Sequence, residues 1–195
     1  MLTTLIQVVS TRQRMPLLRT LPRGSVGAEI GVFKGAFSAK ILATLRPRKL
    51  HLIDPWHYET DTTYKRSWYG GSGGKDQATQ DGIHQSVRDR FAKEIAAGVV
   101  TVHRAPSADA ASQFADAYFD WVYIDGNHLY DFVKMDLHAY FPKVKPGGLL
   151  CGDDYGVKGW WDHGVTRAVD EFVAHGRCNA VSFNRGQFVL RKQTV

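Results

Sequence analysis

Three aspartates in the second half of the chain follow short apolar stretches. Residues 121–124 end directly at Asp125, and residues 149–151 are followed, after one glycine, by Asp153 and Asp154. Clustered carboxylates raise one another's pKa unless a cation neutralises them. All-oxygen ligand sets suit Mg²⁺, Ca²⁺ or Mn²⁺ rather than Zn²⁺. The three aspartates are therefore predicted to bind one hard divalent cation, with Mg²⁺ expected. The alternative is that Asp153 and Asp154 only cap a turn.

A histidine near the first of these acids could serve as a general base. His128 lies three residues after Asp125, and imidazole titrates near neutral pH, so it could take the proton of a hydroxyl group. It could equally hydrogen-bond the backbone or a substrate. His163 is a weaker candidate, and His51, His103 and His138 are expected to be structural or solvent-facing.

The segment between the acids explains why they should meet. Apolar residues recur at helical spacing over residues 129–141, and the two flanking apolar stretches resemble buried parallel strands. A right-handed β-α-β unit places both strand ends at the same edge of the sheet. That edge is where α/β proteins bind ligands. Pro146-Gly147-Gly148 is expected to turn the chain back before the second strand.

The rest of the chain alternates strand and helix patterns until a final hairpin. The pattern predicts an α/β, Rossmann-like fold, with a seven-stranded, mostly parallel sheet, helices on both faces and an antiparallel last strand. Helices are expected near residues 37–45, 83–95, 107–115, 129–141 and 165–173, with Ser107 as an N-cap. Strands are expected at 26–31, 50–53, 99–102, 121–124, 149–151, 179–183 and 187–190.

The first strand ends in a glycine-bearing turn that could approach a ligand closely. It contains Glu29, Gly31 and Gly35, but it is neither a dinucleotide fingerprint nor a phosphate loop. Glu29 would repel a pyrophosphate and suits a cationic ligand. Asp54, after the second strand, can accept hydrogen bonds from a ribose diol. These residues could also be no more than turn residues at strand ends.

Taken in order, these motifs resemble class I S-adenosylmethionine-dependent methyltransferases. The resemblance covers residues 25–195 and carries the E-x-G-x-x-x-G turn, the acid after strand 2 and the acid after strand 4. It implies the strand order 3-2-1-4-5-7-6. It also implies that Glu29, Gly31 and Gly35 surround the methionine part of S-adenosylmethionine, that Asp54 and Asp125 contribute to the cofactor site, and that the region of Ser107 lies near adenine.

A narrower resemblance concerns the acids. The sequences I-D-G-N-H-x-Y, P-G-G and D-D-Y resemble small-molecule O-methyltransferases, many of them magnesium-dependent, including those that act on antibiotic sugars. The resemblance implies Asp125, Asp153 and Asp154 as metal ligands. Some sugar methyltransferases have an acid, the proposed base, where this chain has Asn127, which cannot accept a proton. His128 is the nearest substitute, and Asp125 and His128 are the expected catalytic residues.

Two domain-level segments are expected: an N-terminal helical extension at residues 1–24 and a methyltransferase domain at 25–195. The extension carries four arginines and no acid, which is typical of a targeting peptide or of a helix packed across the ligand edge. The helix is favoured. The two cysteines are expected to be buried thiols of a cytoplasmic protein. No apolar run reaches membrane-spanning length.

The partner is expected to be a small hydroxylated molecule such as a sugar, a phenol or a natural product. The long aromatic loop 56–81 and the pair Trp160 and Trp161 could cover it. Lys and Arg are scattered despite the net charge of +6, so nucleic acid is not indicated, and homo-oligomer formation stays open. The alternatives to a metal-dependent O-methyltransferase are a metal-independent methyltransferase using His128 and a metal-dependent hydroxylase on the same fold.

Overall fold

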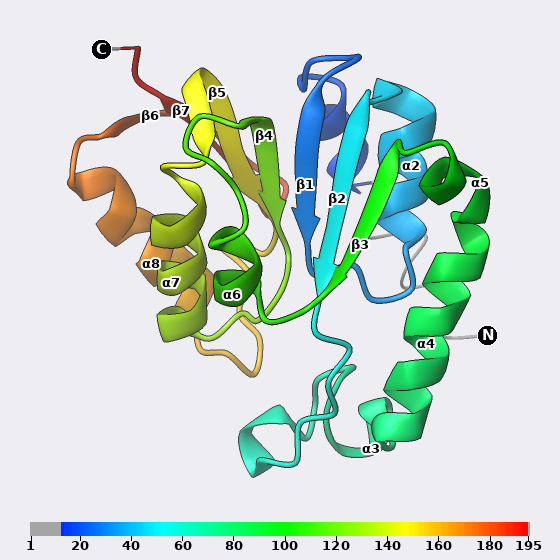
Figure 1. Ribbon diagram of the computed structural model, residues 1–195. Helices are drawn as coiled ribbons and strands as arrows, with labels where there is room; N and C mark the ends of the chain where they lie inside the picture. Colours follow the sequence, from blue (N-terminus) through cyan, green and yellow to red (C-terminus); the bar gives the residue numbers. More distant parts are fainter. Residues whose placement is uncertain (1–12, 195) are drawn as a thin grey trace.

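Seven strands form one sheet in the order β3-β2-β1-β4-β5-β7-β6 in the computed structural model, which describes residues 13–194 (Figure 1). Neighbours among β1 to β5 are parallel, and β7 runs antiparallel to both β5 and β6. The predicted strand order and antiparallel last strand are thereby confirmed. The strands are β1 Val26–Ile30, β2 Lys49–Asp54, β3 Val100–Arg104, β4 Phe119–Ile124, β5 Val144–Gly152, β6 Cys178–Asn184 and β7 Gln187–Lys192.

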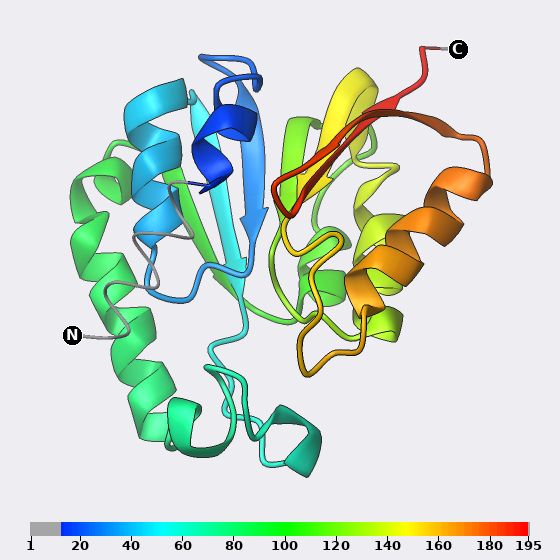
Figure 2. The ribbon, with the colours of Figure 1, turned by 180° about the vertical axis from the view of Figure 1, so that it is seen from behind.

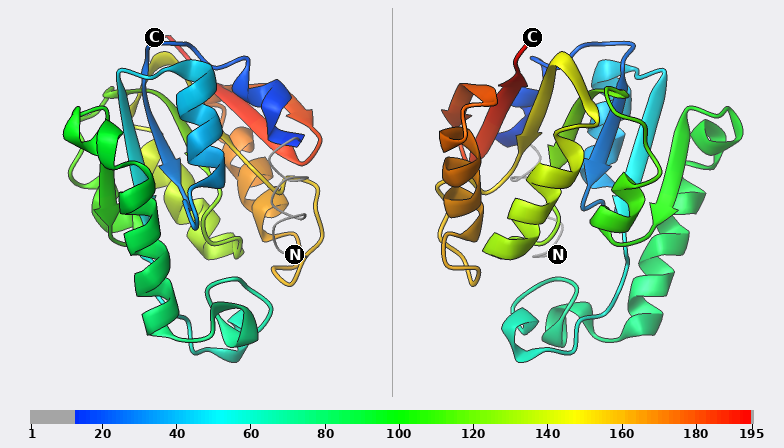
Figure 3. Two further views of the ribbon diagram at one scale, coloured as in Figure 1. Left: turned by 90° about the vertical axis from the view of Figure 1, so that its right-hand side faces the viewer. Right: turned by 60° about the vertical axis from the view of Figure 1, so that its left-hand side comes forward.

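The helices cover both faces of the sheet, as expected (Figures 2 and 3). Side chains on a strand alternate between its two faces, so Val122 and Ile124 of β4 pack with one set of helices and Trp121 and Tyr123 with the other. One face carries α2 Ala36–Leu45, α4 Gln77–Arg90 and α5 Ala92–Ala96, and the other carries α6 Ser107–Ala111, α7 Tyr130–Tyr140 and α8 Gly164–Ala174.

Part of the predicted N-terminal helix lies within the described residues. Residues 13–18 are helical, and Leu17, Leu18 and Leu21 are buried in the core on the α2 side of the sheet. Figure 2 shows this segment between α2 and β7. The rest of the expected helical extension, residues 1–12 with Arg12, lies outside the described residues.

Three local predictions need correction. The expected helix at 83–95 is divided at Phe91 into α4 and α5, because Phe91 leaves helical geometry with φ −108° and ψ 21°. Pro146-Gly147-Gly148 is not a turn that precedes a strand but part of β5, where the register with β4 shifts between the pairs Phe119–Val144 and Trp121–Leu149. The loop 56–81 contains the short helices η1 Thr62–Tyr64 and α3 Gly71–Gly74 and the start of α4.

Two features expected from composition agree with the structure. Cys151 and Cys178 are buried free thiols. Within residues 13–194, no helix is both long enough and apolar enough to cross a membrane.

His51 on β2 gives the fold a pH-dependent stability. Its Nδ1 lies 2.9 Å from Nε2 of His103, and its Nε2 lies 3.1 Å from the hydroxyl of Tyr118. Burial and the neighbouring His103 lower the pKa of His51 to about 3. The unfolded chain therefore binds a proton below pH ~6.5 that the folded chain excludes until pH ~3, and stability is lost as the pH falls through this window.

We expect the free energy of unfolding to decrease by roughly 1 kcal/mol per pH unit from this residue between about pH 6 and pH 4. Urea unfolding at several pH values measures it. The His51→Gln variant should lose that part of the slope, while the contribution of His103, whose pKa is also lowered, remains. An unchanged slope in the variant would show that His51 is charged in the folded protein.

Candidate active site

The carboxyl ends of β4 and β5 bring the three predicted acids to one edge of the sheet. Ile124 of β4 is paired with Gly152 of β5, so Asp125 and the pair Asp153 and Asp154 leave the sheet side by side. Asp154 has a left-handed backbone, with φ 61°. Such a conformation is uncommon for a residue other than glycine and tends to occur at functional sites. The proximity predicted from the β-α-β pattern is thus present.

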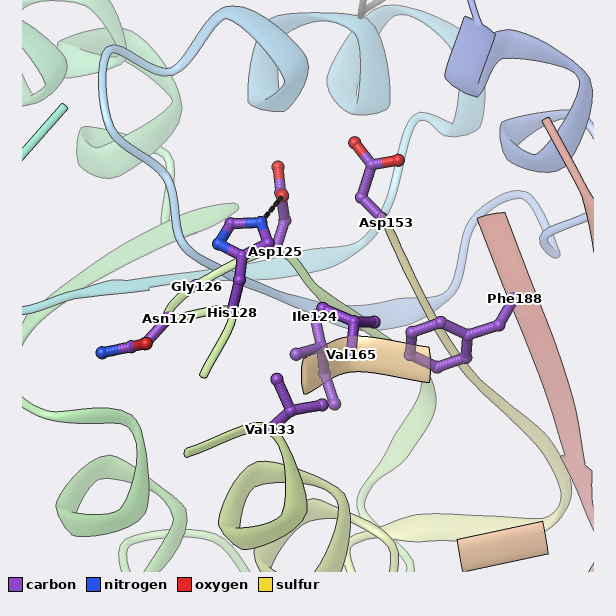
Figure 4. A pocket seen from close by; sticks show the side chains of 9 residues that line it. All are labelled: Ile124, Asp125, Gly126, Asn127, His128, Val133, Asp153, Val165 and Phe188. Atoms are coloured by element: carbon purple, nitrogen blue, oxygen red, sulfur yellow. Dashed lines mark ion pairs between the residues drawn. The ribbon is translucent and has the colours of Figure 1, made fainter. Parts of the chain in front are cut away.

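His128 completes a compact cluster with two of the acids. One ligand atom each from Asp125, His128 and Asp154 lies within 4.8 Å of the others. Nε2 of His128 is 2.7 Å from Oδ2 of Asp154 and 3.5 Å from Oδ1 of Asp125. This nitrogen is buried, yet it makes no well-directed hydrogen bond to either carboxylate. Figure 4 shows the imidazole beside Asp125.

In this cluster, burial and neighbouring charges shift the pKa of each group in opposite directions. Burial alone would lower the pKa of His128, but the adjacent carboxylates of Asp125 and Asp154 raise it to about 9. Burial would raise the pKa of Asp125, yet the charges of Arg14 and His128 hold it below its usual range. In this arrangement His128 carries its proton at neutral pH and is not a free base.

Asp153 faces a different partner, the guanidinium group of Arg14. Nη2 of Arg14 pairs with Oδ2 of Asp153, and Nη1 donates to Oδ2 of Asp125 at 2.5 Å. The other oxygen of Asp153 accepts a hydrogen bond from the amide of Gln187, which itself accepts one from the hydroxyl of Tyr123 at 2.8 Å. Burial and the charge of Asp125 raise the pKa of Asp153 to about 7. The structure therefore joins His128, not Asp153, to Asp125 and Asp154.

Sequence reasoning missed Arg14, Gln187 and Tyr123. It identified an acid-free, arginine-rich N-terminal segment and expected a helix across the ligand edge, but nothing in the local sequence distinguishes Arg14 from Arg19 or Arg23. Gln187 and Tyr123 lie within strands, where no motif marks them.

A cavity of about 10 Å³ lies directly under the cluster (Figure 4). Its walls are polar on one side, at Asp125 and His128, and apolar on the other, at Val133, Val165 and Phe188. The volume is about that needed for one water molecule. The cavity is therefore too small for an acceptor substrate in this conformation.

The turn between β1 and α2 places the predicted cofactor residues beside the acids. Glu29 is buried within β1 and accepts a hydrogen bond from Ser38 of α2 at 2.5 Å. Burial raises the pKa of Glu29 to about 8, although the bond from Ser38 opposes the shift. Gly31 and Gly35 have φ 87° and 68°, a backbone region that glycine adopts without strain. The two glycines shape the turn.

Asp54 fixes this turn through backbone hydrogen bonds. Its Oδ2 accepts from the amides of Val32 and Phe33, both at 2.9 Å, and its Oδ1 accepts from the amide of Trp56 at 2.7 Å. An open cavity of about 640 Å³ lies alongside, lined by Trp56, Arg104 and Pro106 among others. The residues that follow β2, the end of β3 and the start of α4 thus border one opening.

Ser107 does not have the local role that its sequence position suggested. It is the first residue of α6 rather than its N-cap, which is Pro106. Its hydroxyl donates to Asp136 of α7, a buried carboxyl whose pKa burial raises to about 7 against the effect of that bond. The side chain of Ser107 therefore faces the contact between α6 and α7 instead of the open cavity.

Aromatic side chains from two loops meet above the cluster. The ring centroid of Trp160 lies 5.5 Å from that of Tyr64 and 6.5 Å from that of Tyr69, and Trp161 lies 4.7 Å from His128. The Tyr69 hydroxyl and the Trp161 Nε1 are buried without a hydrogen-bond partner. His163, the weaker candidate for a general base, is the N-cap residue of α8 and does not join the cluster.

Comparison with solved structures relates this fold to methyltransferases. The O-methyltransferase NovP has a TM-score of 0.64 at 19% identity, covering 93% of this chain and 80% of its own. The O-methyltransferase TomG from Streptomyces achromogenes, solved with SAM, has 0.59 at 19%, with 95% and 79% covered. The N-methyltransferase NodS from Bradyrhizobium japonicum has 0.59 at 15%, with 95% of both chains covered.

The structural similarity at these low identities establishes the fold alone, and the family is established by a match of the sequence to a family model. No curated protein matches the sequence significantly. The model of a methyltransferase domain matches residues 28–155, which runs from β1 through the acids that follow β5. The chain therefore belongs to this methyltransferase domain family, within the class I S-adenosylmethionine-dependent methyltransferases.

Proposed function

We propose that this methyltransferase transfers its methyl group to a hydroxyl of a small molecule, such as a sugar, a phenol or a natural product, with the help of a divalent cation. The observation that carries the proposal is the cluster of Asp125, His128 and Asp154, in which a buried imidazole nitrogen lies among carboxylate oxygens without a directed hydrogen bond. A cation held there would bring a hydroxyl oxygen close to the methyl donor and lower its pKa.

The donor set indicates which cations fit. Two carboxylates with one imidazole form a mixed oxygen and nitrogen set, which suits Mn²⁺ better than Mg²⁺, whereas an all-oxygen set suits Mg²⁺. Asp125 and Asp154 belong to both sets. We therefore assign these two residues to the cation, with His128 as the nearest third ligand in the present geometry.

A cationic methyl donor at the β1–α2 turn would favour the ionised form of Glu29, whose pKa burial raises to about 8. We place S-adenosylmethionine at the β1–α2 turn, with Glu29, Gly31, Gly35 and Asp54 as its binding residues and Asp125 at the boundary to the metal cluster. In the reaction, the bond between sulfur and the methyl carbon breaks as a bond between that carbon and the acceptor oxygen forms. The sulfonium becomes a thioether, and the hydroxyl proton leaves to a base. Where no cation is bound, His128 is the nearest residue that could take this proton after it has released its own.

The aromatic contacts favour a cyclic acceptor. Tyr64, Tyr69 and Trp160 lie in contact with one another, and Trp161 lies beside His128. Nδ2 of Asn127 donates to the hydroxyl of Tyr64 at 3.0 Å. Rings of this kind pack against sugars and phenols while their polar atoms bind hydroxyls. The unpartnered Tyr69 hydroxyl and Trp161 Nε1 are suitable partners for such hydroxyls.

Chelation tests the metal requirement. The purified protein is treated with EDTA, dialysed and assayed for transfer of a labelled methyl group to a panel of sugars and phenols. We expect activity to disappear and to return with Mg²⁺ or Mn²⁺. Full activity of the chelated protein would contradict the metal requirement but would leave the methyl acceptor identified.

One observation favours a second candidate, a metal-independent methyltransferase. Arg14 already places a positive charge between Asp125 and Asp153, so the acids are partly neutralised without a metal ion. The same chelation experiment separates the two candidates.

Replacement of an aromatic wall residue should affect the acceptor selectively. We expect Trp160→Ala to raise the KM for the acceptor by about tenfold, because a single stacking contact contributes on the order of 1 kcal/mol. The Kd for S-adenosylmethionine, measured by calorimetry, should stay within about twofold. As a control, Trp68→Ala removes a half-exposed tryptophan that stacks on Phe33 instead of Trp160. Equal KM values in both variants would exclude Trp160 from the acceptor site.

A further inference from the structure

Arg14 takes a position at the acidic centre that a cation would otherwise occupy. Its guanidinium bridges Asp125, at 2.5 Å, and Asp153. Its side chain is only 14% exposed, and it reaches Asp125 across 111 residues of sequence. The contact therefore ties the N-terminal segment to the ends of β4 and β5.

Apolar contacts anchor the N-terminal segment, residues 13–21, whereas Arg14 lacks one of its hydrogen bonds. Leu17 and Leu18 are buried in the core, and the guanidinium lies over the rings of Phe37 and Tyr123, at 5.3 and 5.9 Å from their centroids. The Nε of Arg14, however, is buried without a hydrogen-bond partner. An unpaired buried donor costs free energy. The ion pair of Arg14 is therefore not fully satisfied, and another cation could replace the arginine.

Arg14 and the metal cluster compete for the same carboxylate. Oδ2 of Asp125 accepts from Arg14, while Oδ1 of Asp125 faces His128 and Asp154. A divalent cation at Oδ1 carries twice the charge of the imidazolium of His128, so it would be repelled more strongly by Arg14 on the other oxygen in a medium of low dielectric constant. Arg14 also holds Asp153, the third acid, so an all-oxygen ligand set cannot form while the arginine is in place.

From this geometry we infer that Arg14 is an internal cation that excludes divalent metal from the centre until the N-terminal segment withdraws. The inference rests on the proposed metal centre. Withdrawal of Arg14 frees Asp153 to join Asp125 and Asp154, which turns a mixed ligand set into three carboxylates. The N-terminal segment thereby gates the metal centre.

Metal binding without turnover tests the gate. Mn²⁺ binding is measured by calorimetry and by the loss of the free-ion electron paramagnetic resonance signal, for the wild-type chain, Arg14→Gln and Arg19→Gln. Arg19 is an exposed arginine of the same segment and serves as the matched control. We expect Mn²⁺ to bind Arg14→Gln at least tenfold more tightly than the wild type, and Arg19→Gln to match the wild type. Adding Asp153→Asn to Arg14→Gln should remove the gain.

A second measurement uses the wild-type chain, so that it does not depend on the folding of a variant. Trypsin should cleave the bond between Arg14 and Met15 faster in Mn²⁺ than in EDTA. Cleavage after Arg177, at the far end of α8 from the centre, should not change. The Asp154→Asn variant should show no response to Mn²⁺.

The outcomes separate the gate from the proposed function. If wild type and Arg14→Gln bind Mn²⁺ equally tightly and cleavage after Arg14 does not respond, the gate is wrong and the metal centre stands. If neither protein binds Mn²⁺, both the gate and the proposed metal requirement are wrong.

Discussion

Replacing Asp154 by asparagine should reduce methyl transfer by about 100-fold or more, because it removes one of the two carboxylates assigned to the cation in either ligand set. Asparagine tolerates the left-handed backbone at this position, where φ is 61°, better than alanine does, so the fold should be retained. The Kd for S-adenosylmethionine should change little, since Asp154 lies on the His128 side of the centre. Initial rates and calorimetry on the same preparation give both values.

Asp162→Asn is the matched control for this loss. Asp162 is an exposed acid in the loop before α8, with a similar left-handed backbone at φ 44°, and it belongs to no cluster within the described residues. Its replacement should leave the rate unchanged. If Asp154→Asn keeps the wild-type rate, Asp154 is not part of the catalytic centre. If its rate falls and excess Mn²⁺ does not bind it, the metal role of the residue is supported.

The fold and the position of the acids were predictable because both follow from short-range patterns. Apolar strands that end in acids, separated by one helix, place Asp125, Asp153 and Asp154 at a common edge through the handedness of the connection alone. The glycines of the β1–α2 turn are visible for the same reason. No long-range contact needs to be known for either conclusion.

The pairing of the acids was not predictable because it depends on tertiary contacts. Arg14 meets Asp125 only because Leu17 and Leu18 anchor their segment against α2. Arg14 also pairs with Asp153, and the third member of the cluster with Asp125 and Asp154 is His128. The pattern of strand ends in the sequence carries no information on which side chain approaches from another face of the sheet.

Local signals failed where a neighbouring element competed with them. Ser107 has the residue type of an N-cap, but a buried carboxyl on α7, Asp136, takes its hydroxyl. Pro146-Gly147-Gly148 has the composition of a turn, but β5 pairs with β4 on both sides of it. In both cases a contact from the next element outweighs the preference of the residue.

Gly31→Ala should abolish S-adenosylmethionine binding, with a loss of affinity on the order of 100-fold or more, because the turn and the end of β4 cannot both keep their positions. A Cβ on Gly31 would lie 2.0 Å from the carbonyl oxygen of Asp125, far inside van der Waals contact, and the neighbour is backbone rather than a flexible side chain. The turn would have to move away from Asp125, which separates the cofactor residues from the acids.

Gly98→Ala is the control that has the backbone strain of Gly31→Ala without its steric clash. Gly98 also has a positive φ, 72° against 87° for Gly31, but a Cβ there would meet nothing within 4 Å. The left-handed backbone should cost each variant about 1–2 kcal/mol of unfolding free energy, as measured by urea unfolding. Gly31→Ala should lose additional stability from the clash, and it alone should fail to bind the cofactor in calorimetry. If a folded Gly31→Ala variant binds S-adenosylmethionine as tightly as Gly98→Ala does, the close approach of the β1–α2 turn to Asp125 is not needed for the cofactor site.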